Sequence, residues 1–221
     1  MKRRRPSHML SAIAALAAAL ILTPAGSGGV IREGGDEARS NVVAASSSTS
    51  ASENPDAALP TATAKGRAVV STFILKFSSF VSWPPPPPAA PKATEFVVGI
   101  IGDDPLGATI DKMAKTRSVG GVPVKIVRLD SAKVTAEQLT ACRILFVTAT
   151  ERKQWPRIRT LIGKAPVLTI SEMPGFSKER GMVELKPKGG RVSLTVHRTQ
   201  LESVGMKASA NLLRLSTIVE D

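Results

Sequence analysis

Three short runs of consecutive apolar residues dominate the hydrophobic pattern of this chain. They are residues 144–147 (ILFV), residues 96–101 (FVVGII) and residues 166–170 (PVLTI). A strand with one solvated face alternates polar and apolar side chains. These runs do not alternate, so both faces of each predicted strand should be covered. Because helical patterns lie between the runs, we predict an α/β fold: a single three-layer domain whose mixed, mostly parallel sheet is flanked by helices.

Apolar residues at spacings of three and four predict the helices. The longest lies at residues 64–83 and should end there, because Trp83 precedes Pro84 and a residue before proline avoids the α conformation. Three further helices are expected at residues 105–116, 132–140 and 151–163. Asp104 is expected to cap the first of these, and a metal-binding role for Asp103 and Asp104 is the alternative.

The C-terminal part of the chain predicts a hairpin and then a helix. Residues 181–185 and 191–196 alternate apolar and polar side chains around a tip that contains Gly189 and Gly190, which is typical of a β-hairpin. Residues 198–219 carry apolar residues at helical spacing, so we expect a final helix with a break near Gly205.

The beginning of the chain differs in composition from the rest. Residues 1–25 combine a positively charged start, an apolar stretch and small residues after it, as secretory signal peptides do; an uncleaved membrane anchor is the alternative. Residues 26–64 are rich in serine, alanine and glycine. They are expected to form a disordered linker, because they cannot bury enough apolar surface to offset the entropy of ordering. The folded α/β domain is therefore expected over residues 65–221 of an exported protein.

Composition narrows the possible functions. The chain of 221 residues carries a net charge of +12, which would suit nucleic acid, an anionic membrane surface or an acidic partner, but export argues against nucleic acid. The single cysteine, Cys142, excludes a disulfide within the chain, and the two histidines exclude a multi-histidine metal site. No cofactor or metal is expected. A hydrolase built on Ser171 and His197 is not expected either, because the sequence lacks the GxSxG elbow.

Residues 171–180 (SEMPGFSKER) form the candidate binding site. Met173 and Phe176 are apolar side chains among polar ones, in a loop that should run over the surface, and such residues are typical of a contact site. Together with Met182 and Glu184 of the adjacent hairpin, they make up the set predicted to bind a partner. The alternative is that Phe176 folds back over an edge of the sheet.

Several short motifs follow one another along the folded part of the chain. They are FxxWP at residues 80–84, GDDPLG at 102–107, CRILFV at 142–147, VLTISE at 167–172, GF at 175–176, GMV at 181–183 and SxxLLRL at 209–215. In this order they resemble the YfiR family. The resemblance implies a periplasmic α/β binding protein, not an enzyme, that represses an inner-membrane diguanylate cyclase. It would do so by binding the periplasmic sensor region of the cyclase, and would thereby lower cyclic di-GMP signalling and biofilm formation. It also implies a homodimer.

One feature departs from the pattern of that family. Its members often carry disulfide-forming cysteines, whereas Cys142 alone cannot form an internal bridge. The alternative function is a periplasmic small-ligand-binding module that serves a receptor or transporter, with its ligand at the carboxyl ends of the strands. For either function, contact with the membrane would be only indirect.

Overall fold

The computed structural model describes residues 58–88 and 92–220. The predicted signal peptide and most of the predicted linker lie outside the described residues. The last residues of that linker are described, and Pro60–Ala62 form a short 3-10 helix there, η1. Within the described ranges, no helix is both long and apolar enough to cross a membrane.

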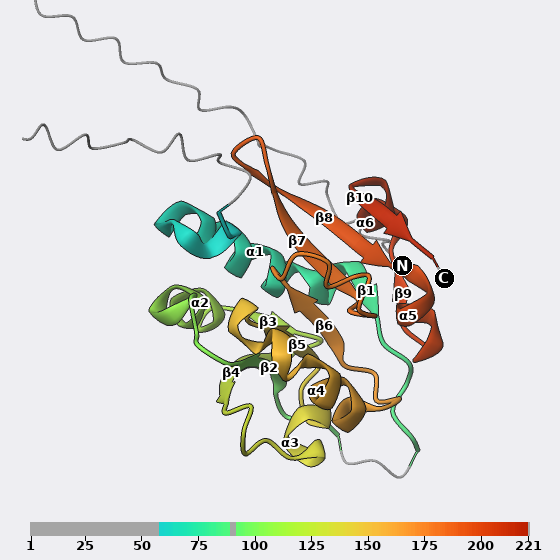
Figure 1. Cartoon of the computed structure of the whole chain (residues 1–221). Coiled ribbons are helices and arrows are strands. Elements are labelled where there is room, and N and C mark those ends of the chain that lie inside the picture. The colour runs from blue at the N-terminus through green and yellow to red at the C-terminus, as the bar shows by residue number, and fades with distance from the viewer. Residues whose placement is uncertain (1–57, 89–91, 221) are drawn as a thin grey trace, which may run out of the picture. The chain divides into compact units, whose positions relative to one another are not determined.

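One eight-stranded sheet forms the centre of the described residues, with the strand order β10-β8-β7-β6-β5-β2-β4-β3 (Figure 1). Its strands are β2 (Phe96–Ile101), β3 (Ser118–Val119), β4 (Val122–Leu129), β5 (Ile144–Val147), β6 (Leu168–Ser171), β7 (Val183–Lys188), β8 (Arg191–His197) and β10 (Ser216–Val219). Neighbouring strands run parallel except β7 with β8 and β3 with β4. The predicted α/β fold with a mixed, mostly parallel sheet is confirmed.

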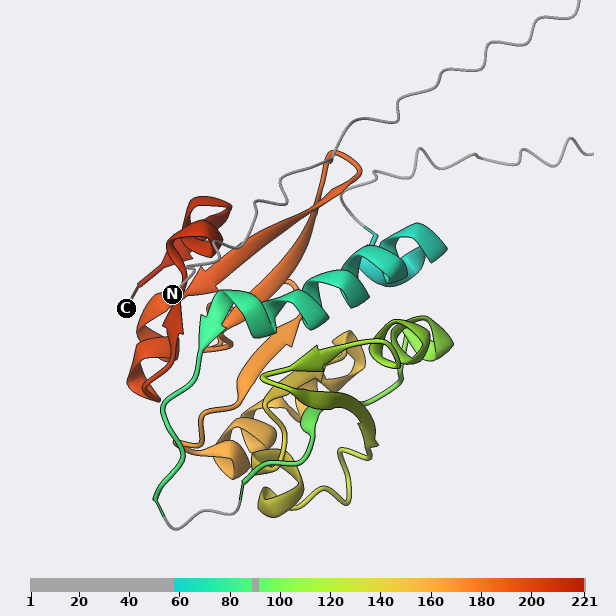
Figure 2. The same cartoon turned by 180° about the vertical axis from the view of Figure 1, so that it is seen from behind.

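Helices cover both faces of this sheet. One layer contains α1 (Ala64–Phe80) and α2 (Gly107–Ala114), and the other contains α3 (Ala136–Thr140) and α4 (Trp155–Ile162). Seen from behind in Figure 2, α1 crosses in front of the sheet, whereas α4 lies in front of it in Figure 1. Ile144 and Phe146 of β5 join the apolar cluster beneath α1, and Leu145 and Val147 join the cluster beneath α4. The run ILFV is uninterrupted because both of its faces are buried.

The predicted helices are present with shorter bounds. α1 ends at Phe80 because the chain then enters the short strand β1 (Val81–Ser82). The prediction that Asp104 is the N-cap is wrong, because α2 begins only at Gly107 and its N-cap is Leu106. The Asp104 carboxylate instead stabilises the turn before the helix, where it accepts hydrogen bonds from the backbone N–H groups of Leu106 (2.8 Å) and Gly107 (3.1 Å). The helix predicted at residues 151–163 divides into a 3-10 helix, η2 (Ala149–Lys153), and α4.

The C-terminal segment differs from the single helix that its apolar spacing predicts. It forms α5 (Arg198–Ser203), β9 (Lys207–Ala208), α6 (Ala210–Arg214) and the edge strand β10. The break at Gly205 is confirmed, with φ at 75°. The prediction that the helix continues to residue 219 is wrong. Thr217, Ile218 and Val219 are β-branched, and β10 pairs in parallel with the edge of β8 that faces away from β7. The predicted hairpin is β7–β8, turned by Gly189 and Gly190 at φ of 54° and 71°.

The residues that follow α1 pair with the C-terminal segment beside the sheet. β1 pairs antiparallel with β9, with Val81 opposite Ala208. The backbone N–H of Ser209 also donates to the carbonyl of Phe80 over 2.7 Å. The end of α1 is therefore held by the C-terminal segment, which is drawn in red in Figure 1.

Candidate functional site

The four residues predicted to bind a partner lie in or beside the loop between β6 and β7. All four are buried: Met173 is 1% exposed, Phe176 0%, Met182 7% and Glu184 0%. The prediction that Met173 and Phe176 are exposed at the surface is therefore wrong. The alternative, in which Phe176 folds back over an edge of the sheet, is correct in that the ring is buried, but the ring packs against Trp155 of α4 and not over a sheet edge.

Phe176 is buried because α4 offers it an aromatic partner. Its ring packs against Trp155 with the ring centroids 4.6 Å apart and the planes at 49°. Such a pair contributes about 0.5–1.5 kcal/mol beyond the area that it buries. The backbone of Gly181 lies directly against the same ring. A Cβ atom at that position would lie 2.2 Å from Phe176 Cδ1, so a larger residue would clash with the ring. The loop is polar in sequence, yet its aromatic side chain belongs to the apolar cluster beneath α4.

Glu184 of β7 binds this loop through hydrogen bonds to its carboxylate. One carboxylate oxygen accepts a hydrogen bond from the N–H of Gly175 (2.9 Å), and the other accepts from the N–H (2.9 Å) and the hydroxyl (2.6 Å) of Ser177. Lys186 Nζ lies 3.3 Å from the first oxygen. Burial would raise the pKa of Glu184, but these hydrogen bonds and the lysine outweigh burial and hold the pKa below its usual range. Glu184 is thus a charged residue of the interior that fixes the loop.

A second buried carboxylate, Glu172, connects the loop to the N-terminal side of the described chain. It accepts hydrogen bonds from the hydroxyl of Thr61 (2.5 Å) and from the backbone N–H of Thr61 (3.0 Å). Burial raises the pKa of Glu172, and the two hydrogen bonds from Thr61 only partly oppose this effect. The helical turn η1 is therefore fixed at the carboxyl end of β6.

Between residues 58–59, which precede η1, the loop and β7 lies a cleft of about 340 Å³, which we call the loop cleft. It is lined by Ala58, Leu59, Glu172, Pro174, Gly175, Lys178, Glu184, Leu185, Lys186 and Pro187. Of the four predicted residues, Glu184 lines this cleft, whereas Met173 and Phe176 lie in the apolar cluster beneath α4. Leu59 stands at the cleft with 36% of its surface exposed. From the loop, Pro174, Gly175 and Lys178 therefore line the cleft, and Met173 and Phe176 do not.

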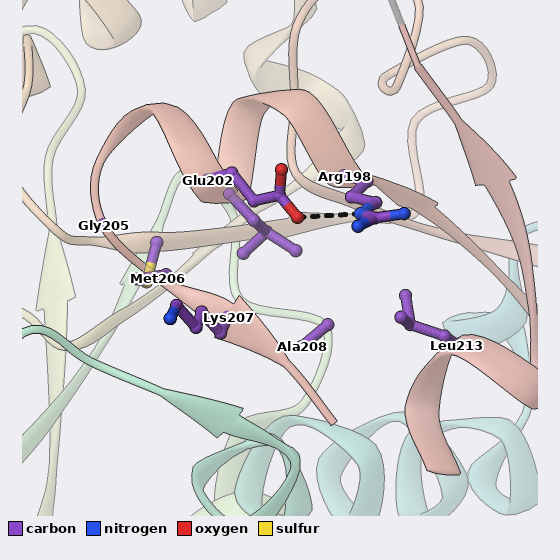
Figure 3. A pocket seen from close by; sticks show the side chains of 8 residues that line it. Arg198, Glu202, Gly205, Met206, Lys207, Ala208 and Leu213 are labelled. Carbon is purple, nitrogen blue, oxygen red and sulfur yellow. Dashed lines mark hydrogen bonds and ion pairs between the residues drawn. The ribbon is translucent and has the colours of Figure 1, made fainter. Parts of the chain in front are cut away.

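A further cleft of about 500 Å³ lies in the C-terminal segment (Figure 3). In it, α5 contributes Arg198 and Glu202, whose side chains form an ion pair over 2.7 Å. Met206, the residues of β9 and Leu213 of α6 complete the lining. Because charged side chains, those of the ion pair and of Lys207, line this C-terminal cleft together with apolar ones, the cleft is amphipathic.

Several exposed apolar residues were missed by the sequence analysis. The large ones among the described residues are Leu59, Leu215 and Ile218, with 36%, 73% and 43% of their surface exposed. Leu59 falls in the segment assigned to the linker, and the other two were assigned to a helix. The β-branched run at residues 217–219 is the sequence signal that could have identified the edge strand.

The nucleophilic and metal-ligating residue types have structural roles where they are described. The hydroxyl of Ser171 donates to the carbonyl of Val147 (2.6 Å) and accepts from the N–H of Met173 (3.0 Å). Burial raises the pKa of Cys142 to about 11. Asp104, considered as a metal ligand, pairs with Arg128 over 2.8 Å. No group of three or more histidine, cysteine, aspartate or glutamate side chains in the described ranges is arranged to hold a metal ion.

The chain resembles known proteins to very different extents. A stretch of 52 residues is 46% identical to a glutathione synthetase of Parasynechococcus marenigrum, but it covers 22% of this chain and 17% of that protein. The chain thus spans less than a fifth of that relative. The YfiR/HmsC-like family, in contrast, matches residues 67–217, from the first turn of α1 into β10. This chain therefore belongs to the YfiR/HmsC-like family.

Proposed function

We propose that this protein is a periplasmic repressor of an inner-membrane diguanylate cyclase and acts by binding the periplasmic sensor region of that enzyme. The observation that carries the proposal is the family match over residues 67–217, because the YfiR-like family is periplasmic and regulatory, not catalytic. Repression would require that the protein bind the inactive arrangement of the sensor more tightly than the active one. Release of the protein would then raise the cellular level of cyclic di-GMP.

The surface that we assign to the cyclase is the rim of the loop cleft. Leu59 and Pro174 supply exposed apolar area, and Lys178 and Lys186 add positive charge. Beneath the rim, Phe176 and the buried carboxylates fix the backbone, so little entropy is lost when a partner docks. In this proposal the residues predicted from the sequence support the contact surface from inside the protein.

A binding assay with exposed residues tests the proposal. The full mature protein is immobilised, and the periplasmic region of a membrane diguanylate cyclase from the same genome is the analyte. Leu59→Asp and Lys178→Glu are each expected to weaken binding by about tenfold or more, as loss of a central contact does. Lys76→Glu on the exposed side of α1 is the matched control and should leave the affinity unchanged. Phe176→Asp is unsuitable, because a charge at this buried position would unfold the loop.

Two results would contradict the proposal at different levels. If the unmodified protein binds no membrane-anchored cyclase, and its deletion leaves cyclic di-GMP unchanged, the repressor function is wrong. If binding is seen but Leu59→Asp and Lys178→Glu behave like the control, the function stands and the loop cleft is not the contact surface.

We also propose a homodimer that pairs through β10. This strand is the last of the sheet, and its side away from β8 has no strand partner in the described chain. Leu215 and Ile218 are exposed there, and antiparallel pairing of two β10 strands would cover both while satisfying free backbone groups. Ile218→Lys is expected to yield monomers in light scattering, whereas Ala132→Lys, before α3, should not. A monomeric unmodified protein would refute the pairing.

A further inference from the structure

A small recess lies between α4 with the two residues after it, β6, the end of the β6–β7 loop and α5. Its volume is about 120 Å³, and it shares no lining residue with the loop cleft or the C-terminal cleft. It is lined by Trp155, Arg159, Ile162, Gly163, Lys164, Thr169, Arg180, Met182, Gln200, Ser203 and Val204. This volume corresponds to roughly four water molecules in the liquid, at about 30 Å³ each. A ligand that fits must therefore be small.

The charges around the recess all have the same sign. Arg159, Lys164 and Arg180 line it, and no aspartate or glutamate does. Lys164 and Arg180 form no ion pair with any residue that the structure describes. The nearest acid in sequence, Glu179, is engaged by Arg152 over 2.8 Å. The carboxyl end of α4 contributes only about half a negative charge, so the recess is strongly positive.

The backbone that carries Arg180 is fixed in place. The carbonyl of Glu179 accepts hydrogen bonds from Trp155 Nε1 (3.0 Å) and from the guanidinium of Arg159 (3.2 Å). Arg180 itself has φ at 64°, and it is the non-glycine residue with positive φ among those described. A side chain in this left-handed conformation is strained, and such strain persists only where the surroundings enforce it. The loop backbone therefore positions Arg180, whose side chain is exposed, beside the recess before any ligand binds.

We propose that this recess binds a small tetrahedral oxyanion, either inorganic phosphate or the phosphate group of a small phosphate monoester. The guanidinium groups of Arg159 and Arg180 can donate paired hydrogen bonds to such oxygens, and the ammonium of Lys164 adds a third charge. Anion binding here would fix α4, the loop and α5 to one another, since one residue or more of each element lines the recess. The measurement needs no cyclase, so its outcome is separate from that of the proposed function.

Titration calorimetry of the full mature protein tests the site, with inorganic phosphate as the probe at constant ionic strength. We expect a dissociation constant of about 1 mM or tighter. Arg180→Gly and Lys164→Gln should each weaken binding by about tenfold or more, because each removes charge-assisted hydrogen bonds. Arg180→Gly suits the positive φ of this position, so it removes the charge without adding backbone strain. Lys153→Gln, which changes the same charge on exposed η2 outside the recess, is the control.

Further probes identify the ligand class. Glycerol phosphate distinguishes a monoester from free phosphate. If it binds more tightly than inorganic phosphate, the natural ligand carries an organic group; if inorganic phosphate binds more tightly, the natural ligand is free phosphate. Acetate tests whether any small anion suffices. Acetate binding as tight as phosphate, no phosphate binding at all, or equal losses in Arg180→Gly and Lys153→Gln would each overturn the proposal.

Discussion

Replacing Glu184 by glutamine is expected to lower the free energy of unfolding by about 3 kcal/mol near neutral pH. Glutamine has nearly the shape of glutamate, so the change removes the charge and one acceptor without leaving a cavity. The carboxylate is 0% exposed and accepts hydrogen bonds from Gly175 and Ser177. Water cannot replace the acceptor that is lost.

The magnitude follows from the two orientations open to the new amide. If its NH2 group takes the place of the first oxygen, it faces the N–H of Gly175 and the ammonium of Lys186, which are both donors. If it takes the place of the second, it faces Ser177, whose hydroxyl can turn to accept but whose N–H cannot. The second orientation leaves one buried N–H without an acceptor, which costs about 1–3 kcal/mol, and loss of the charge weakens the remaining bonds by about 1 kcal/mol.

Urea unfolding of the two proteins measures this difference, and its pH dependence identifies the cause. The folded protein holds the pKa of Glu184 below its unfolded value of about 4.3. The contribution of the carboxylate is therefore complete above that value and is lost as the pH falls through the folded-state pKa. The difference between wild type and Glu184→Gln should shrink over this acidic range.

Glu179→Gln is the matched control. Its carboxylate pairs with Arg152, and 40% and 46% of the two side chains are exposed, so the change should cost no more than about 1 kcal/mol. A loss below about 1 kcal/mol for Glu184→Gln would refute the reasoning, because a single unsatisfied buried donor already costs that much. A difference that stays constant as the pH falls would show that the charge is not responsible.

Three further predictions concern the same region and the core. Phe176→Ala should cost about 3–5 kcal/mol in urea unfolding, because the ring is fully buried against Trp155, whereas exposed Pro174→Ala should change stability by no more than about 0.5 kcal/mol. Thr61→Val should raise the pKa of Glu172 further in a carbon NMR titration and cost about 1–2 kcal/mol, since it removes a hydrogen bond that opposes the effect of burial; an unchanged titration would contradict the contact. Cys142, with burial raising its pKa to about 11, should react with a thiol reagent about 100-fold more slowly in the folded protein than in urea, and equal rates would show that the site is open.

The parts of the fold that the sequence predicts correctly are those whose cause is local. The run ILFV at residues 144–147 indicates a strand buried on both faces, because a strand with one solvated face would carry polar residues at alternate positions. Asp104 is recognisable as a hydrogen-bond acceptor in the turn before α2, although not as its N-cap, because the donors, the N–H groups of Leu106 and Gly107, are only two and three residues away. Gly189 and Gly190 identify the hairpin for the same reason, since the turn needs positive φ at both positions.

The errors arise where a distant residue decides the outcome. Phe176 is buried because Trp155 and Gly181 form its pocket, and nothing in the loop sequence itself indicates this. Thr61 and Glu172 are 111 positions apart, so their contact at the loop cleft has no local signal. Ile218 continues a helical spacing of apolar residues, yet it forms part of a strand, because it lies in a β-branched run and the edge of β8 is available for pairing.

The closure of α1 by β9 sets an order in which the protein can acquire its structure. Ser82 and Lys207 are 125 positions apart, and Leu201, Met206 and Leu212 belong to the same apolar cluster as α1. At a synthesis rate of about 5–20 residues per second, the helix waits roughly 6–25 s before these residues exist. During this interval the part of α1 that packs with Leu201, Met206 and Leu212 has no C-terminal segment to cover it, so some of its apolar surface stays exposed until the last elements have been made.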